Sequence, residues 1–391
     1  MQIYSKNRKN GDKIIFLSTY PPRQCGLATF TYDLSIAVRR AMPSIDVGII
    51  AVDNEVSKKY KYPSEVVGRI YFKDVDDYIE AARAINNDPS IKVVSIQHEF
   101  GIYGRKDINY LSAFLENIKK PVVVTMHTLV KEPSVYSRSV IQYIIEKSSV
   151  AVFQVKSALD ILSYDYGIKS KKVKIIRHGV PVSLYESGLK QKEKLGLQGR
   201  RVLSSFGLIS SGKAYEFIVM ALPKVVKKFP NVLYLIIGAT HPGVKMKEGE
   251  KYRNFLKAEV KRLGLEDNVR FVNRYLTLDE LIEYLKATDI YVSSGLGLKQ
   301  IVSGTLSYAM SVGRPVISHP FVHAVEALAD GRGILVRLKD SNSYARAINL
   351  LLGDEALRHK MGKEAYKYAS KFTWPKVGQD YAKIFKKLSK N

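Results

Sequence analysis

Lysine, serine and glycine stand together in the segment 207–213, where a phosphate could bind. The segment reads GLISSGK, follows an apolar β-branched run and precedes a helical pattern. It fails the P-loop motif at the last position, because Ala214 occupies the place of the hydroxyl that would hold magnesium, so an ordinary nucleoside triphosphatase is disfavoured. Lys213 can still meet a phosphate as a point charge.

A second candidate for phosphate binding is the run Ser303, Gly304 and Thr305, which opens a short apolar helical pattern. Its backbone amides and hydroxyls would converge on the positive end of the helix dipole, where a diphosphate fits. A helix cap without any ligand would use Ser303 or Thr305 equally well, so both interpretations stay open.

Polar side chains also follow two apolar runs in the first half of the chain. Gln97, His98 and Glu99 end one run, and His127 ends the next. Adjacent parallel strands would bring the two groups together, and burying them is costly unless they pair with each other or with a ligand. A satisfied structural hydrogen-bond network is the alternative. Neither group has the histidine spacing of a zinc site.

Gly26 opens the first predicted helix, after a loop with two prolines. A glycine there lets backbone amides approach a ligand, and the start of a helix favours an anion. An ordinary tight turn from strand to helix explains the same residues.

All these residues lie where predicted strands end, and the strands belong to two series of alternating strands and helices. The first series has a helix at 26–41 and strands at 13–18, 46–52, 91–96, 122–125, 150–153 and 173–176. The second has helices at 215–229, 251–263 and 278–286, a helical tail from Ser341, and strands at 202–206, 232–237, 269–272, 289–292, 315–318 and 333–336. This pattern predicts two doubly wound α/β domains, in which ligands bind at the carboxyl ends of the strands.

A polar, glycine- and lysine-containing stretch after Gly179 separates the two series and is typical of a linker. We therefore expect an N-terminal domain at residues 1–180 and a C-terminal domain at 181–371. The segment 372–391 restarts a helical pattern after a proline, and we expect a helix that could cross back to the N-terminal domain.

The chain has 391 residues, with 62 Lys and Arg against 37 Asp and Glu, a formal net charge of +25. This excess favours anionic partners, with nucleic acid, acidic lipid and sugar phosphates all open. The single cysteine, Cys25, excludes a disulfide framework and suits a reducing compartment. No apolar stretch approaches the roughly 20 residues of a membrane span. We expect a cytoplasmic protein, with peripheral contact at the inner face of the membrane left open.

Taken together, the motifs resemble those of the GT-B glycosyltransferases of family four, the retaining glycosyl transferases group 1. The segments that carry the resemblance are 21–30 (PPRQCGLATF), 97–101 (QHEFG), 238–242 (GATHP), 273–275 (NRY) and 300–308 (QIVSGTLSY). The resemblance implies two Rossmann-like domains that face each other across a cleft. It also implies an acceptor bound mostly on the N-terminal half and a nucleotide sugar bound mostly on the C-terminal half.

Carried over residue by residue, the resemblance implies that Gly26 lies near the donor phosphates and His127 beside the reacting sugar. Lys213 matches the lysine that binds the diphosphate. The other implied donor-binding residues are Ser210, Gln300, Ser303, Gly304, Thr305 and Tyr308, and the acceptor-side residues are Gln97, His98 and Glu99.

The chain departs from the family pattern at three positions. Leu208 stands where an arginine is expected before the lysine, so we expect another cation, Arg274, to serve the leaving group. The paired glutamates of the family align with Gln300 and Tyr308. Gln300 could still bond sugar hydroxyls, whereas Tyr308 cannot grip a ribose diol as a carboxylate does.

The resemblance implies a retaining, metal-independent glycosyltransferase with no cofactor. It would move a hexose, preferably mannose from GDP-mannose, to a sugar, glycan or glycolipid acceptor. The alternative is a catalytically weak protein of the same fold that binds a nucleotide sugar or a glycan. A nucleic-acid-binding protein is disfavoured, because no recognisable module for nucleic acid is present and the 25 tyrosines are scattered.

Overall fold

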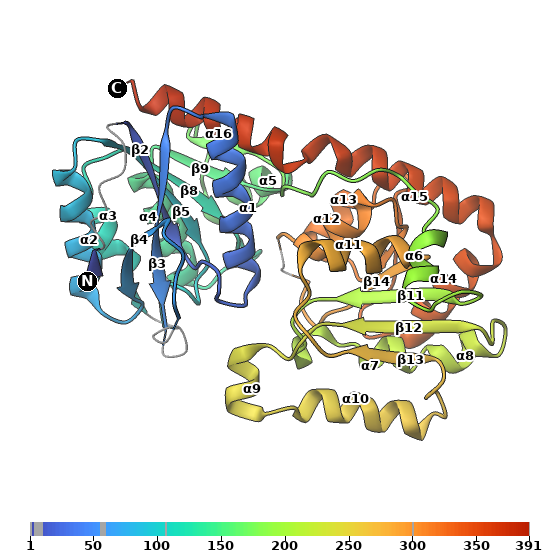
Figure 1. Cartoon of the computed structure of the whole chain (residues 1–391). Helices are drawn as coiled ribbons and strands as arrows, with labels where there is room; N and C mark the ends of the chain where they lie inside the picture. Colours follow the sequence, from blue (N-terminus) through green and yellow to red (C-terminus); the bar gives the residue numbers. More distant parts are fainter. Residues whose placement is uncertain (1, 4–10, 55–59, 106–107, 299–300, 391) are drawn as a thin grey trace. The chain divides into compact units, whose positions relative to one another are not determined.

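The computed structural model describes residues 2–3, 11–54, 60–105, 108–298 and 301–390. Two α/β units make up the chain (Figure 1). The first unit comprises Met1–Gly179, Lys299–Val302 and Trp374–Asn391, and the second comprises Val180–Leu298 and Ser303–Thr373. The first unit is therefore completed by the C-terminal segment from Trp374 and by the short segment Lys299–Val302.

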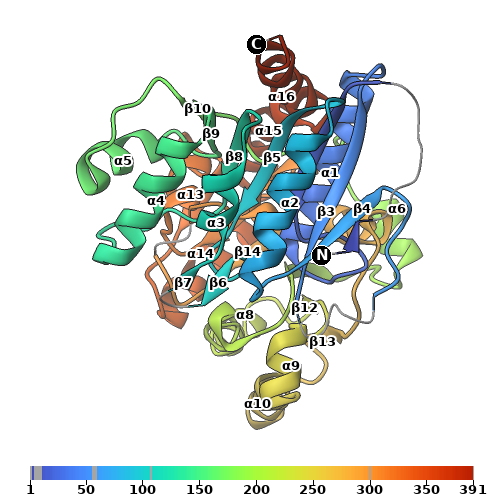
Figure 2. The ribbon, with the colours of Figure 1, turned by 90° about the vertical axis from the view of Figure 1, so that its left-hand side faces the viewer.

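The first unit is built on a sheet in the order β1-β4-β3-β2-β5-β8-β9-β10, parallel except for β1. Its strands are β1 (Gln2–Ile3), β2 (Lys13–Ser18), β3 (Asp46–Asp53), β4 (Val66–Tyr71), β5 (Ile91–His98), β8 (Val122–Met126), β9 (Val150–Phe153) and β10 (Val173–Ile175). A hairpin of β6 (Gly104–Arg105) and β7 (Ile108–Asn109) lies apart from this sheet. Figure 2, seen from the side of the first unit, shows β5, β8 and β9 in this order.

Helices cover both faces of this sheet, which explains the unbroken apolar character of its central strands. The helices are α1 (Gly26–Ala41), α2 (Val75–Asn87), α3 (Leu111–Asn117), α4 (Val135–Lys147), α5 (Ala158–Tyr166) and α16 (Trp374–Leu388). Local sequence sets their starts: the side chains of Asp74 and Ser134 accept hydrogen bonds from backbone amides of the first turns of α2 and α4.

The second unit has an all-parallel sheet in the order β13-β12-β11-β14-β15-β16. Its strands are β11 (Arg201–Phe206), β12 (Val232–Ile237), β13 (Val269–Val272), β14 (Ile290–Ser293), β15 (Val316–Ser318) and β16 (Gly333–Leu335). Its helices include α6 (Leu189–Lys194), α7 (Glu216–Val219), α8 (Leu222–Val226), α9 (Pro242–Glu248), α10 (Lys251–Arg262), α11 (Leu278–Ala287), α12 (Gly304–Ser311), α13 (Val322–Ala327), α14 (Ser341–Gly353) and α15 (Glu355–Ala369), with short 3₁₀ turns η2 (Ser211–Lys213) and η3 (Ser370–Phe372).

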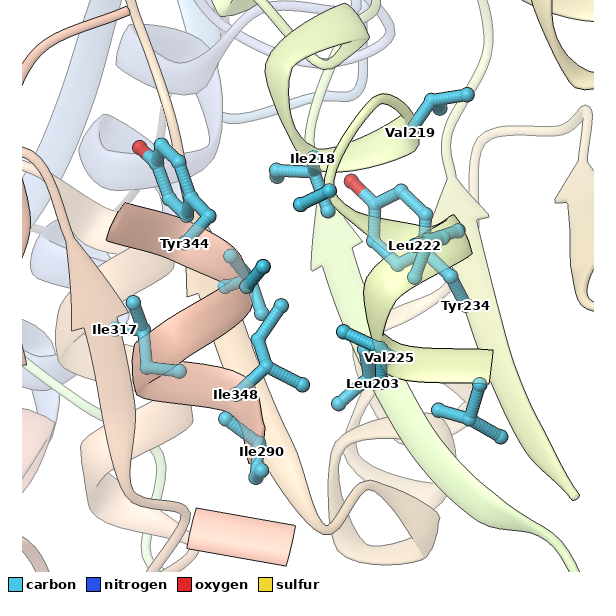
Figure 3. Packing of buried hydrophobic residues seen from close by; sticks show 14 of the residues in the cluster. Leu203, Ile218, Val219, Leu222, Val225, Tyr234, Ile290, Ile317, Tyr344 and Ile348 are labelled. Atoms are coloured by element: carbon cyan, nitrogen blue, oxygen red, sulfur yellow. The ribbon is translucent and has the colours of Figure 1, made fainter. Parts of the chain in front are cut away.

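One predicted helix of the second unit is divided. The sequence pattern predicts a single helix at 215–229, but the structure has α7 and α8 there, and Pro223 lies in the first turn of α8. Proline has no N–H to donate and is tolerated at the first turn of a helix, so a new helix starts at this point. Both helices still contribute to one core: Ile218 and Leu222 pack in the same buried cluster as Tyr344 and Ile348 of α14 (Figure 3).

Helix α16 lies along α1 in the first unit and closes its core (Figure 1). The Tyr381 hydroxyl forms a 2.7 Å hydrogen bond with the Thr125 hydroxyl of β8. The indole of Trp374 packs against the backbone of Gly179, where a Cβ atom would lie 2.2 Å from the ring. At Gly378 the two helices touch backbone to backbone, since a Cβ there would lie 2.5 Å from the Ala37 carbonyl oxygen.

We predict that Gly378→Val detaches α16 from α1, because the new side chain has no room beside Ala37. The expected loss of stability is about 1–3 kcal/mol, as for other overpacked contacts. Hydrogen exchange measured by mass spectrometry should accelerate in residues 374–388. Gly101→Ala is the control, since nothing lies within 4 Å of its Cβ position, and equal exchange in both variants would contradict the prediction.

Candidate functional site

In the second unit, Lys213 and the start of α12 lie against the same glycine at the carboxyl end of β11. A Cβ atom on Gly207 would lie 3.4 Å from the Lys213 Nζ atom and 3.6 Å from the Thr305 Cγ2 atom. Gly207 has a φ of +134°, a conformation that favours glycine. The two segments that the sequence analysis nominates for phosphate binding therefore lie together within one unit.

Backbone contacts hold Lys213 in place. Its N–H donates to the Ser210 carbonyl at 2.9 Å, and its own carbonyl accepts from the Ser294 hydroxyl at 2.7 Å. The side chain is half-buried, and burial lowers the pKa of the ammonium. No described residue forms a hydrogen bond or an ion pair with Nζ, so the charge is available to an anion.

The start of α12 offers amides rather than hydroxyls. The Ser303 hydroxyl accepts from the Leu306 N–H at 3.3 Å and bonds the Thr305 hydroxyl at 3.0 Å, so it acts as a helix cap. No described residue accepts a hydrogen bond from the backbone N–H of Gly304 or Thr305. These two donors point out of the first turn, where the helix dipole favours an anion.

A glycine pair extends this edge of the sheet to β12. Gly238 has a φ of +139°, and a Cβ atom there would lie 2.1 Å from the Gly207 carbonyl oxygen. Arg253 of α10 fixes the segment, because its guanidinium donates to the Gly238 carbonyl at 3.2 Å and to the Thr240 hydroxyl at 3.0 Å. Sequence reasoning missed Arg253, since it reaches back from a helix with no local motif.

Tyr308 and Gln300 stand where the family resemblance leads one to expect paired glutamates. Tyr308 is 6% exposed and packs in the core of the second unit, with its ring 6.5 Å from that of Phe206. It therefore offers almost no surface to a ligand, and its predicted place among the donor-binding residues is not favoured by this packing. Gln300 lies outside the described residues.

Arg274, the predicted second cation, lies at the carboxyl end of β13 and is exposed. It forms an ion pair with Glu280 of α11 at 2.5 Å, and this hydrogen bond raises the pKa of its guanidinium. None of its contacts among the described residues involves Lys213 or α12. The structure thus places Arg274 in an ion pair with the glutamate that caps α11, and its role as the second cation stays a prediction.

In the first unit, His127 lies between two glutamines at the ends of β5, β8 and β9. The side-chain amide of Gln154 donates to its Nδ1 at 3.2 Å, so the proton is on Nε2, which donates to the side-chain Oε1 of Gln97 at 3.1 Å. Burial, with smaller effects of His178 and His98, lowers the pKa of His127 to about 3. Both nitrogens of this neutral ring are occupied, which fixes its orientation.

His98 and Glu99 differ in whether their polar atoms have hydrogen-bond partners. Glu99 accepts hydrogen bonds from the Thr128 hydroxyl at 2.5 Å and from the Phe100 N–H at 3.0 Å, and burial raises its pKa. His98 is 1% exposed and stacks on Tyr103 at 5.9 Å. Neither of its ring nitrogens has a partner among the described residues, and burial lowers its pKa to about 3. The structure therefore brings the predicted residues together, and pairs all but His98.

Gly26 begins α1 at an open place. No atom lies within 4 Å of the position that its Cβ would take, and the Cys25 sulfur caps the helix by accepting from the Ala28 N–H at 3.4 Å. A ligand could approach the backbone here, as the sequence predicts.

The described part of the chain contains no group of three or more His, Cys, Asp or Glu side chains that could hold a metal ion. In the same residues, no helix has both the length and the apolar character that crossing a membrane requires. Independence from metal remains a prediction.

Residues 189–368 match the family model described as "Glycosyl transferases group 1". The match lies within the second unit and covers less than half of the chain. The matched region runs from α6 into α15 and includes Lys213, Gly207 and the start of α12.

Comparisons with individual proteins show similarity over a larger part of the chain than residues 189–368. An uncharacterized glycosyltransferase of Methanocaldococcus jannaschii is 26% identical over 65% of this chain and 62% of that protein, so the chain spans less than two thirds of that relative's length. The crystal structure of Anabaena HepE with UDP and glucose has a TM-score of 0.72 at 17% identity, covering 96% of this chain and 100% of that one. Sucrose-phosphate synthase from Thermosynechococcus elongatus has a TM-score of 0.77 at 16% identity, covering 96% and 99%.

These structural likenesses confirm the predicted fold class. Both units are Rossmann-like α/β units with parallel sheets, and the fold is that of the GT-B glycosyltransferases.

The buried histidines of the first unit predict acid sensitivity. Burial lowers the pKa of His98 and His127 to about 3 and that of His178 to about 4, so below pH 6.5 the unfolded chain binds more protons than the native one. The raised pKa values of Asp53 and Glu99 oppose this effect. We expect urea unfolding of the first unit to show stability falling from pH 6.5 to pH 5 by about 1.4–4 kcal/mol per pH unit.

His98→Phe should reduce this slope by about 1.4 kcal/mol per pH unit, because it removes one titrating ring whose nitrogens have no described partners. The exposed His359 provides the control variant His359→Phe, which should leave the slope unchanged. Stability independent of pH over this range would contradict the prediction.

Proposed function

We propose that the chain is a glycosyltransferase that uses a nucleotide diphosphate sugar as donor. The observation that carries the proposal is the meeting of the Lys213 ammonium, the backbone of Gly207 and the free amides of α12 within the region that matches the family model. These groups suit a diphosphate. HepE, which has the same fold, was crystallised with UDP and glucose, and this supports a nucleotide donor.

The proposed chemistry is transfer of a hexose with retention of configuration and without a metal. The bond from the anomeric carbon to the diphosphate oxygen breaks, and the acceptor hydroxyl oxygen forms a new bond on the same face. The acceptor proton passes to the leaving diphosphate. Lys213 and the amides of Gly304 and Thr305 would stabilise the charge that develops on that group, which is commonly the largest contribution to catalysis.

The finer assignments rest on the family resemblance alone. We propose mannose from GDP-mannose as the preferred donor, and a sugar, glycan or glycolipid as acceptor on the first unit. Gln97, His98 and Glu99 would lie on the acceptor side, and His127, hydrogen-bonded to Gln97, would lie beside the reacting sugar. A cytoplasmic location with peripheral contact at the membrane belongs to the same proposal.

A second candidate is a protein that binds a nucleotide sugar or a glycan without transferring it. Two observations favour it: Leu208 replaces the expected arginine, and Tyr308 is buried where a carboxylate would bind the ribose. The two candidates differ in turnover, not in binding.

Lys213→Ala tests the proposed function. We expect transfer from radiolabelled nucleotide sugars to fall by about 10²–10³-fold, the usual cost of removing a group that stabilises developing charge. The variant should remain folded, because it loses an ammonium that has no described partner. Lys360→Ala, at an exposed position on α15, is the matched control and should keep full activity.

Three outcomes separate the candidates. If the wild-type protein transfers sugar and the Lys213→Ala variant does not, the transferase is supported. A rise of the melting temperature with nucleotide sugars but no transfer supports the binding protein. Transfer that is equal in wild type and Lys213→Ala would refute the assigned site.

A further inference from the structure

The phosphate site of the second unit lacks a second cation among its described residues. Leu208 takes the place of the expected arginine, and Arg274 is engaged with Glu280. A single ammonium, that of Lys213, would face a diphosphate with two negative charges. Another group should therefore supply positive charge when the ligand binds.

His319 is the candidate that sequence reasoning missed, although it follows β15 just as His127 follows β8. It is 2% exposed. Its Nε2 lies 3.1 Å from the Gly297 carbonyl oxygen, and its Cε1 lies 3.0 Å from the position that a Cβ of Gly295 would take. The Nδ1 atom has no hydrogen-bond partner in the described structure. The ring is thus wedged against the loop that follows β14.

That loop is also the one that holds Lys213. Ser294 donates its hydroxyl to the Lys213 carbonyl at 2.7 Å, and the Leu296 N–H donates to the Gly212 carbonyl at 3.1 Å. A Cβ on Gly295 would lie 3.5 Å from the same Gly212 carbonyl oxygen. The imidazole of His319 and the backbone of Lys213 therefore contact the same loop, through Gly297 and Ser294 respectively.

The groups around His319 favour its neutral form. Burial and the charge of Lys213 lower its pKa, whereas the backbone carbonyls of Gly297 and Ser293 favour the protonated form. His323 of α13 accepts the Ser303 N–H at 2.9 Å, and Tyr344 of α14 donates its hydroxyl to the Ser293 carbonyl at 3.0 Å. No carboxylate contacts the ring among the described residues.

We propose that His319 takes up a proton when a diphosphate binds beside Lys213, and so provides the second positive charge of the site. The anion reverses the sign of the local field, and the carbonyls of Gly297 and Ser293 can then accept from both ring nitrogens. His319 acts through the loop and its charge, which makes it a positioning residue. This inference rests on the proposed function, because it needs a diphosphate at Lys213.

The test is calorimetric titration with UDP-glucose and GDP-mannose, whose diphosphates carry no titrating proton near neutral pH. Titrations at pH 7 in two non-phosphate buffers of different ionisation enthalpy give the number of protons taken up. We expect wild type to take up as much as about one proton per bound molecule, and its affinity to fall by up to about tenfold per unit as pH rises. His319→Gln should lose both effects, and His359→Gln, at an exposed position, should lose neither.

The outcomes are distinct. Binding with the same proton uptake in wild type and His319→Gln would overturn this inference and leave the proposed function intact. If no protein binds either nucleotide sugar, the proposed function fails and the inference fails with it.

A second measurement covers the case in which His319→Gln does not fold. Nitrogen spectra of the wild-type protein with labelled histidine report the protonation of all seven rings. One buried ring should change from neutral to doubly protonated when the nucleotide sugar is added. If every ring keeps its state in the bound protein, the inference is wrong.

Discussion

In the second unit, the arrangement at the carboxyl end of β11 depends on the closeness of the Lys213 ammonium to the amino end of α12. Two centres of positive potential do not approach each other without a compensating anion or a scaffold that holds them. Here the scaffold is a set of short backbone hydrogen bonds from β11, β14 and their following loops, with glycine where any side chain would intrude. The packed core of the second unit keeps the lysine and the helix end close together. An anion bound between them would relieve the repulsion between these two positive centres.

The first unit differs, because the buried histidines at its strand ends carry no charge. Its strand ends carry polar rings that are buried without charge, and amides from neighbouring strands hold one of them by both nitrogens. A neutral imidazole held in this way presents a fixed shape and a fixed hydrogen-bond pattern. The two units thus offer different environments, one positively charged and one neutral but polar.

Much of the fold could be predicted from sequence, because β-branched runs and helical periodicity are local signals. The start of α1 at Gly26 and the strand β2 follow from them. The sequence pattern joined α7 to α8, since one proline in a helical pattern does not say whether a helix bends or restarts. The meeting of Lys213 with Thr305 was predictable from the rule that ligands bind at strand ends. The roles of Arg253, His319 and Tyr308 were not, because they depend on which way a side chain turns within the packed unit.

The last helix belongs to the unit that the ribosome makes first. Residues 1–179 carry one wall of a core whose other wall, at 374–388, is nearly two hundred positions further along the chain. During synthesis α1 must therefore keep an uncovered apolar face while the entire second unit emerges and folds. Partly folded chains with such faces are prone to aggregate, so production in the cell favours either rapid translation of the second half or protection of that face by a chaperone.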